Sequence, residues 1–341
     1  MFKKIIGIIV CAILAVAILA GCAATTETPN TSGTPEPEVT PTSADSPAPL
    51  TLVLDWTPNT NHTGLYAALE LGYYKDAGID LEIVQPPEDG ALTLVAADRA
   101  DFGISFQEEV LIAANAEPPL PVVAIASVVE HNTGGIMSMT EAGITRFSDM
   151  EGKSFASWQI PIYDEIVRES IIADGGNPDN VEFVPNSGID PISGMKYEYD
   201  AVWVYEGWEK IIADLNGVDT NFLLLKDINP VFDYYTPVII CNQSTLDNRI
   251  DMVKSFLAAT EKGYTYAKEN PAEAAEILIK YAPETDADII HASQEYLSGQ
   301  YFSSKWGFID EVRWNAFFDW LKEKELVDAG ASSVGFVNIE R

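Results

Sequence analysis

The chain has 341 residues and a net charge of −32 at neutral pH, from 20 basic and 52 acidic side chains. This imbalance argues against nucleic acid and anionic lipid headgroups as partners, because both repel an acidic surface. The three histidines are far apart in the sequence and have no zinc-binding spacing, so we expect no metal site and no cofactor.

The first 22 residues have the features of an export signal. Lys3 and Lys4 precede an apolar run, Ile5 to Leu19, which is short for a membrane span of about 20 residues. The tetrapeptide LAGC resembles the bacterial lipobox, and by that resemblance the chain is cut before Cys22, whose thiol carries lipid. An uncleaved N-terminal anchor is the alternative. Either way we expect the rest of the chain to be extracytoplasmic, held at the cell membrane of a bacterium.

Residues 23–49 are expected to form a disordered tether. They are rich in Thr, Pro, Ser, Ala and Glu and contain no aromatic residue. Such a segment cannot bury enough apolar surface to offset the entropy lost on ordering, and its prolines keep it extended. About 290 residues remain, which is enough for two lobes.

From residue 50 the chain alternates strand and helix patterns. This order is typical of a mostly parallel sheet with helices on its faces. The first set of expected elements is a strand at 50–56, a helix at 62–72, a strand at 79–84, a helix at 90–100, and strands at 101–105 and 121–130.

The alternation then repeats and ends in helices. The second set is a strand at 153–158, a helix at 163–173, a strand at 181–186, a short helix near Ile192, a strand that runs into a helix within 200–208, and strands at 221–227 and 234–242. The last of these strands is expected to return to the first lobe. Two helical faces are predicted in the tail, with a helix start at Asn270-Pro271 between them: Val253, Phe256, Leu257, Thr260 and Tyr264, then Trp314, Phe317, Phe318 and Leu321.

We therefore predict an α/β fold of two lobes joined by two crossover segments and finished by C-terminal helices. Lobe 1 comprises residues 50–130 and 235–341, and lobe 2 comprises residues 131–234. Ligands of open α/β sheets bind beyond the carboxyl ends of the strands, so a ligand is expected between the lobes, with hinge closure around it.

Several segments together resemble a known family. They are DWTPNTNHTGLY, GYYKDAGIDLEIVQPP, ADFGISFQEEV, VEHNTGG, YEGW and DYYTPVII. They are similar to the NMT1/ThiY-like (SsuA/THI5-like) solute-binding proteins of ABC importers, and the similarity covers Leu50 to about Leu326. The resemblance implies the type II periplasmic-binding-protein fold. It also implies a ligand such as a thiamine-precursor pyrimidine (hydroxymethylpyrimidine or a formylaminopyrimidine), with riboflavin as the alternative.

A second resemblance concerns an enzyme. Trp56, Pro58 and His62 match the W-x-P-x-x-x-H start of fungal pyrimidine synthases, in which the histidine is consumed with pyridoxal phosphate and iron. Those enzymes carry a cysteine-rich stretch before the returning strand. This chain has only Cys241 there, so we expect no catalysis and keep the synthase as a less favoured alternative.

The segment after the first strand supplies the first ligand-binding candidates. Trp56 ends the strand, and a flat indole there stacks well on a heteroaromatic ring. Asn59, Asn61 and His62 stand at a helix entrance, where Asn61 or Thr63 is expected to be a plain cap. His62 is expected to contact ligand or to be structural. Tyr66, in the same segment, completes the group.

Further candidates follow the next strands. Ser105, Phe106 and Gln107 lie on the loop after the third strand, while Glu108 and Glu109 place negative charge in a first helical turn. Trp158 ends a strand of lobe 2 as Trp56 does in lobe 1, and the two indoles are expected to sandwich a ring. His131 and Asn132 are expected at the hinge.

The stretch VWVYEGW supplies the last strand-end candidates. Tyr205 and Glu206 end the strand, and Glu206 is expected to accept from the exocyclic amine of an aminopyrimidine, whereas Trp203 is expected in the core and Trp208 in packing. Tyr234 and Tyr235 enter the second crossover and are expected to touch ligand or to hold the closed state.

The sequence therefore predicts an extracytoplasmic receptor for a small heteroaromatic ligand. Arginines are few, so an anionic ligand such as a phosphate, sulfonate or nitrate is disfavoured. Expected partners are an ABC permease and its ATPase, and the receptor itself is expected to be a monomer.

Overall fold

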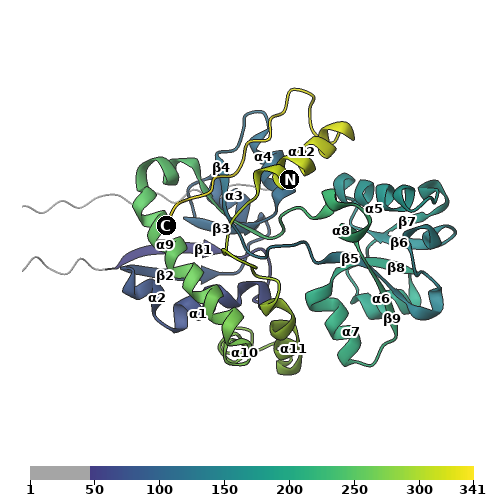
Figure 1. Ribbon diagram of the computed structural model, residues 1–341, viewed down its shortest axis with the longest axis horizontal. Helices are drawn as coiled ribbons and strands as arrows, with labels where there is room; N and C mark the ends of the chain where they lie inside the picture. The colour runs from purple at the N-terminus through teal and green to yellow at the C-terminus, as the bar shows by residue number, and fades with distance from the viewer. Residues whose placement is uncertain (1–46) are drawn as a thin grey trace, which may run out of the picture. The chain divides into compact units, whose positions relative to one another are not determined.

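The computed structural model describes residues 47–341. The predicted signal peptide, the lipidated Cys22 and almost all of the predicted tether lie outside these residues. The strands form two five-stranded sheets, which we call sheet A and sheet B (Figure 1). Sheet A consists of β2 (Ile79–Val84), β1 (Ala48–Val53), β3 (Phe102–Ser105), β10 (Val238–Asn242) and β4 (Val122–Ser127), in that spatial order. Sheet B consists of β7 (Glu182–Pro185), β6 (Ser154–Ser157), β8 (Ala201–Tyr205), β5 (Gly134–Met139) and β9 (Thr220–Leu224).

Helices follow the strands as the alternating pattern predicts. With sheet A go α1 (Thr63–Glu70), α2 (Tyr73–Asp76), α3 (Gly90–Ala96) and α4 (Gln107–Ala114). With sheet B go α5 (Pro161–Ala173), α6 (Pro191–Tyr197), α7 (Ile211–Leu215) and α8 (Leu225–Ile228). The C-terminal helices are α9 (Gln243–Glu269), α10 (Pro271–Ile279), α11 (Ala287–Ser298) and α12 (Glu311–Glu323). Single turns occur at η1 (Thr60–His62), η2 (Thr140–Ala142), η3 (Phe147–Met150), η4 (Pro178–Asn180) and η6 (Pro230–Phe232), and η5 (Glu206–Lys210) is a π-helix.

Each sheet has one reversed strand, and that strand follows a crossover. β10 runs antiparallel to both β3 and β4, while β1 pairs in parallel with β2 and β3. In sheet B, β5 runs antiparallel to β8 and β9, while β6 pairs in parallel with β7 and β8. The predicted two-lobe α/β fold is confirmed, and so is the return of β10 to the first sheet. The lobe limits at residues 130 and 235 stay predictions, since the chain passes between the sheets over 128–133 and 229–237.

The apolar face predicted on α9 is buried against α1 and sheet A. Phe256 stacks on Phe102 of β3, with ring centroids 3.7 Å apart, and its other neighbour is Tyr74, at 5.7 Å. At the α1–α9 crossing, a Cβ placed on Gly263 would lie 2.0 Å from the Gly64 carbonyl oxygen, so this contact needs glycine. Tertiary burial of this kind, more than helix propensity, holds the long helix in place.

Helix α12 packs on the second crossover through an aromatic cluster. Phe317 stacks on Tyr234, with centroids 4.2 Å apart, and Trp320 meets Phe232 edge-on at 5.3 Å. Beyond the C-terminal end of the helix, Lys324 pairs with Glu165 and Glu169 on α5. The last helix therefore contacts the second crossover and, through Lys324, helix α5. Figure 1 shows how α12 and α5 are arranged in the fold.

Two predicted helix caps differ in detail. Asn59 caps η1 by accepting from the Asn61 backbone N–H, so the plain cap expected at Asn61 or Thr63 is wrong. α10 begins at Pro271 as predicted, but the Asn270 side chain donates back to the Tyr266 carbonyl and does not cap. Propensity placed both helix starts correctly, whereas the partner of each polar side chain depends on tertiary geometry.

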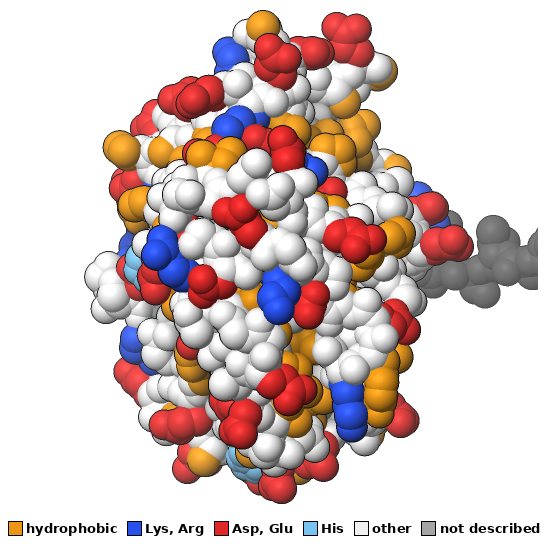
Figure 2. Space-filling model, turned by 90° about the vertical axis from the view of Figure 1, so that its right-hand side faces the viewer, with side chains coloured by type: hydrophobic (Ala, Val, Ile, Leu, Met, Phe, Trp, Pro, Cys, Tyr) orange, Lys and Arg blue, Asp and Glu red, His pale blue; other side chains and the backbone are white. Residues whose placement is uncertain are grey.

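The surface is acidic, as the net charge requires. On the face drawn in Figure 2, which lies on the side of sheet B, carboxylates are scattered among apolar and neutral atoms while Lys and Arg side chains are sparse. Within residues 47–341, no helix is both long and apolar enough to cross a membrane.

Candidate functional site

A cavity of about 420 Å³ lies between the two sheets, at the ends of their strands. Its walls come from the segments after β1, β3 and β6, from the end of β8 with the π-helix η5, and from the residues before β10. This is the edge at which ligands of open α/β sheets bind. The lining residues are Asp55, Trp56, Asn59, Thr60, Asn61, Phe106, Thr133, Trp158, Ile160, Tyr163, Trp203, Val204, Tyr205, Gly207, Trp208, Glu209, Thr236, Pro237 and Leu297.

The lining combines aromatic rings with carboxylates. Among the described residues that form it, four are tryptophans, two are carboxylates and none is Lys or Arg. Rings present a negative face, and carboxylates accept hydrogen bonds, so the cavity favours a flat ligand that carries N–H donors or positive charge. An anionic ligand would find no charged partner in this wall.

Two tryptophans enter the cavity wall from different sheets. Trp56 follows β1 and is 68% exposed, and Trp158 follows β6 and is 52% exposed. Two large aromatic side chains exposed in one cavity form an apolar patch, and such a patch marks a contact surface. The structure thus places both indoles of the predicted sandwich in one cavity, and their contact with ligand stays a prediction.

His62 is held by hydrogen bonds and lies outside the cavity lining. It is fully buried; its Nε2 is 2.7 Å from Asp55 Oδ1, and its Nδ1 accepts from the Asn59 backbone N–H at 3.2 Å. This pattern assigns the proton to Nε2, which donates to the carboxylate. The imidazole therefore fixes Asp55, and it is the carboxylate that reaches the cavity.

The π-helix η5 separates two glutamates that are close in sequence. Glu206 accepts from the Tyr296 hydroxyl of α11 at 2.5 Å and does not line the cavity. Glu209 does line it, and its Oε2 accepts from the Tyr205 backbone N–H at 3.0 Å. Burial raises the pKa of the Glu209 carboxyl above its ordinary value, because the charged form loses water. Glu209 is therefore the better-placed acceptor for a ligand N–H.

The other predicted site residues divide into two groups. Asn59, Asn61, Phe106 and Tyr205 line the cavity. The rest are engaged elsewhere: Tyr66 stacks on Tyr281, Ser105 donates to Glu109, Gln107 donates to the Trp314 carbonyl and accepts from the Tyr235 N–H, Tyr234 stacks on Phe317, and the Tyr235 hydroxyl accepts from the Asp310 N–H.

Sequence reasoning missed several lining residues. Trp203 is buried as expected of a core residue, yet it also forms part of the wall, and Trp208 and Glu209 do so from η5. Tyr163 enters from α5, with its ring 5.3 Å from that of Trp203. A strand-end position was the available signal for Asp55, whereas the π-helical turn that aims Glu209 has no sequence signature.

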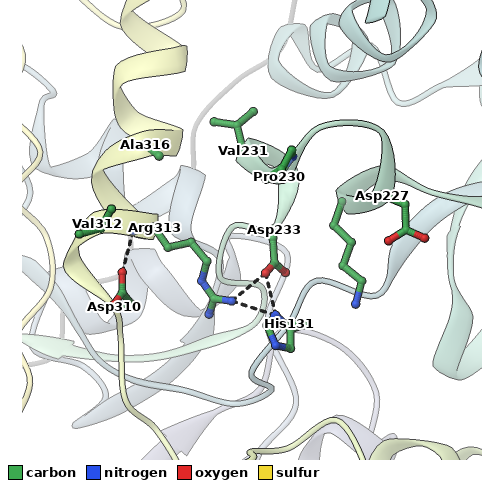
Figure 3. Close-up of a pocket in the computed structure, with 10 residues that line it drawn as sticks. His131, Asp227, Pro230, Val231, Asp233, Asp310, Val312, Arg313 and Ala316 are labelled. Carbon is green, nitrogen blue, oxygen red and sulfur yellow. Dashed lines mark hydrogen bonds and ion pairs between the residues drawn. The ribbon is translucent and has the colours of Figure 1, made fainter. Parts of the chain in front are cut away.

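A second, larger cavity of about 560 Å³ lies beside the crossovers and α12 (Figure 3). Arg313 of α12 reaches Asp233 Oδ2 at 2.9 Å and His131 Nδ1 at 3.1 Å, and its guanidinium also donates to the Glu130 carbonyl at 2.5 Å. Arg313 and Asp233 form an ion pair, and these contacts tie the two crossovers together. The cavity between the two sheets is the candidate ligand site, because its polar and aromatic groups converge from both sheets.

The part of the chain that the structure describes contains no cluster of metal-ligating side chains. There, no three His, Cys, Asp or Glu side chains are grouped so that they could hold a metal ion. Cys241 is a free thiol, buried in β10.

Comparisons with known proteins agree with this geometry. The chain is 29% identical over 308 residues to a formylaminopyrimidine-binding protein of Halalkalibacterium halodurans, covering 83% of this chain and 89% of the relative. It is 26% identical over 257 residues to a 4-amino-5-hydroxymethyl-2-methylpyrimidine phosphate synthase of Legionella pneumophila, covering 69% and 74%. The alkanesulfonate-binding protein SsuA of Xanthomonas axonopodis pv. citri has a similar structure, with a TM-score of 0.65, 11% identity, and coverage of 87% of this chain and all of that one.

These matches identify the fold and the family. The likeness to SsuA supports the periplasmic-binding-protein fold and nothing about ligand, because the sequence identity is low. The family described as NMT1/THI5 like matches residues 59–274, a span that includes both sheets' central strands and most of the cavity wall. This chain belongs to the NMT1/THI5 like family.

Proposed function

We propose that this protein is an extracytoplasmic receptor that binds an aminopyrimidine precursor of thiamine between its two sheets and delivers it to an ABC permease. The observation that carries the proposal is the cavity wall, which joins tryptophans from both sheets with two carboxylates and no basic side chain. The similarity to the formylaminopyrimidine-binding protein of Halalkalibacterium halodurans supports the ligand class. The volume of about 420 Å³ is within the range of about 300–1,000 Å³ that small-molecule pockets have.

The ligand chemistry follows from the wall. A pyrimidine ring stacks on indole, and such contacts add about 0.5–1.5 kcal/mol beyond burial of area. The exocyclic amine of an aminopyrimidine donates hydrogen bonds that Glu209 or Asp55 can accept, and a protonated ring nitrogen adds a charge-assisted bond. A phosphorylated or sulfonated ligand brings negative charge beside these carboxylates and is expected to be rejected.

A receptor role fits His62 better than a synthase role. A histidine that is consumed in a reaction must present its ring to the cofactor and substrate, whereas His62 is buried, bonded at both nitrogens and absent from the cavity lining. We therefore expect the intact mass of the protein to stay unchanged after incubation with pyridoxal phosphate and iron. A mass change located at His62 would favour the synthase.

Ligand titration tests the proposal. The panel consists of 4-amino-5-hydroxymethyl-2-methylpyrimidine, its formylaminomethyl analogue, its phosphate ester, thiamine, riboflavin and taurine. We expect the first two to quench tryptophan fluorescence and to raise the melting temperature, because a ligand that binds only the folded state stabilises it. Binding of taurine or of the phosphate ester alone would contradict the proposal. Tight binding of riboflavin alone would indicate that the ligand is a flavin and not a pyrimidine.

A further inference from the structure

A buried carboxylate lies where the two sheets meet beside the cavity. Glu108, in the first turn of α4, is only 3% exposed. Its Oε1 accepts from the Tyr163 hydroxyl at 2.7 Å, while its Oε2 is buried and has no hydrogen-bond partner among the described residues. A charged carboxylate with one unpartnered oxygen is costly in such a position, and a neutral carboxyl costs less.

The Glu108–Tyr163 contact joins the two halves of the cavity. Glu108 follows β3 of sheet A, and Tyr163 lies on α5, which follows β6 of sheet B. Tyr163 is itself part of the cavity wall, beside Trp203. A second tyrosine–glutamate pair, Tyr296 with Glu206, also joins the sheets, but Glu206 is partly exposed. Of the two contacts, only the first has its carboxylate shut away from water.

The surroundings of Glu108 favour its neutral form. The titratable groups that face it are Glu109 on α4, Tyr163 on α5, Tyr205 at the end of β8 and Tyr234 on the second crossover. Burial raises the pKa of the Glu108 carboxyl to about 7; the Tyr163 hydrogen bond opposes this rise, and the charge of Glu109 adds to it.

We propose that Glu108 is a positioning residue that couples closure of the cavity to the uptake of one proton, acting through Tyr163. The proposal rests on the proposed function, since it assumes that the sheets close on a ligand. When the sheets part, Glu108 regains water and ionises; when they close, it is buried against Tyr163 and binds a proton. Ligand affinity is thereby set by pH at a residue that does not touch the ligand.

The direction of the pH dependence follows from linkage. A solvated Glu carboxyl has a pKa of about 4.5, and the buried one has a pKa of about 7. Closing takes up a proton between these values, so affinity is highest below about pH 4.5 and falls as pH rises through about 7. The fall is at most about tenfold per pH unit, because one proton is exchanged.

The test compares wild type with Glu108→Gln, which keeps the shape and an acceptor for Tyr163. Calorimetric titrations with the formylaminomethyl pyrimidine are run at pH 5, 6, 7 and 8. The ratio of wild-type to variant affinity cancels the titration of the probe and of Glu209. We expect this ratio to fall by more than about tenfold from pH 5 to pH 8. Buffers of different ionisation enthalpy should report uptake approaching one proton near pH 6 in wild type and less in the variant.

Glu206→Gln is the matched control, since it alters the other tyrosine–glutamate pair and should keep the wild-type pH profile. An affinity ratio for Glu108→Gln that is constant with pH would overturn the proposal. The same titrations separate failure of this coupling from failure of the proposed ligand. Binding with a constant affinity ratio overturns the coupling alone, whereas no binding of the pyrimidine to either protein at any pH contradicts the proposed function and the coupling together.

Discussion

At the scale of single residues, the cavity depends on which glutamate of EGWE faces it. In η5 the chain makes a π-helical turn, and such turns often occur at functional sites. Glu206 turns toward Tyr296 on α11, while Glu209, three residues later, reaches the cavity. Position at the end of β8 favours Glu206 as the cavity residue, because the sequence pattern does not indicate the π-helical turn that follows the strand.

Glu209→Gln should weaken binding of 4-amino-5-hydroxymethyl-2-methylpyrimidine by roughly 10–150-fold, since hydrogen bonds to a charged group contribute about 1.5–3 kcal/mol. The loss should be smaller for an analogue that lacks the exocyclic amine. Calorimetric titration measures both affinities. Glu206→Gln, which keeps an acceptor for Tyr296, should stay within about threefold of wild type. If the two variants lose affinity equally, the carboxylate of Glu209 does not contact the amine.

The sequence pattern predicted the position of the cavity, at the ends of the strands, better than it predicted which side chains line it. Trp56 and Trp158 were predictable because both follow strands, and both are in the lining. His62 and Tyr66 follow the same first strand, but the turn at η1 directs them inward, to Asp55 and to Tyr281. Tyr163 and Trp208 come from helices, where the side that faces a cavity depends on how two lobes pack. That packing is not encoded in local periodicity.

At the scale of elements, the α1–α9 crossing permits almost no extra volume. Gly263→Ala would place a methyl carbon against the Gly64 carbonyl, and backbone cannot move aside as a side chain can. We expect this variant to lose more than about 3 kcal/mol of unfolding free energy or to fail to fold. Gly299→Ala is the control, because the nearest atom lies at an ordinary contact distance of 3.6 Å. Urea unfolding that shows equal stability for the two variants would mean that the helices separate easily.

Helix α12 holds the crossovers through Arg313. The guanidinium reaches Asp233 (Figure 3) and the Glu130 carbonyl, and its central carbon lies 3.8 Å from the centroid of the Tyr235 ring. Arg313→Met removes these contacts, and we expect a loss of about 1–3 kcal/mol in urea unfolding.

Arg168 offers a matched comparison for Arg313. It also pairs with an aspartate, Asp179, and lies over the Phe183 ring at 4.5 Å, but its pair is exposed. Arg168→Met should therefore change stability by less than about 1 kcal/mol. Equal losses for the two methionine variants would show that the contacts of Arg313 with the crossovers stabilise the fold no more than an exposed ion pair does.

The fold was largely predictable at this scale. Alternation of strand and helix patterns identified the sheets, and the buried faces of α9 and α12 followed from 3.6-residue periodicity. β5 was not predicted as a strand, because its segment starts with two glycines and contains Ser138, which weakens the apolar pattern. It runs antiparallel to its neighbours because the crossover brings the chain to the edge of sheet B where β8 ends, as the pairing of Gly134 with Tyr205 shows.

At the scale of the whole molecule, we propose that the receptor is tethered to the membrane by lipid on Cys22. Cys22→Ala should release the protein from the membrane fraction or leave it unprocessed, with a change in electrophoretic mobility. Ligand binding should remain, because the cavity is formed by residues 55–297. Unchanged fractionation and mobility would contradict lipid anchoring and favour an uncleaved anchor.

The position of β10 in sheet A sets the order in which the chain can fold. β10 lies between β3 and β4, yet it follows every strand of sheet B in the sequence. As the polypeptide emerges from N- to C-terminus, all strands of sheet B are available before β10. During this time β3 and β4 each have an unpaired edge, because β10 is the strand that lies between them. Unpaired strand edges are prone to aggregation, so the newly made chain passes through a vulnerable interval that ends only when Asn242 has emerged.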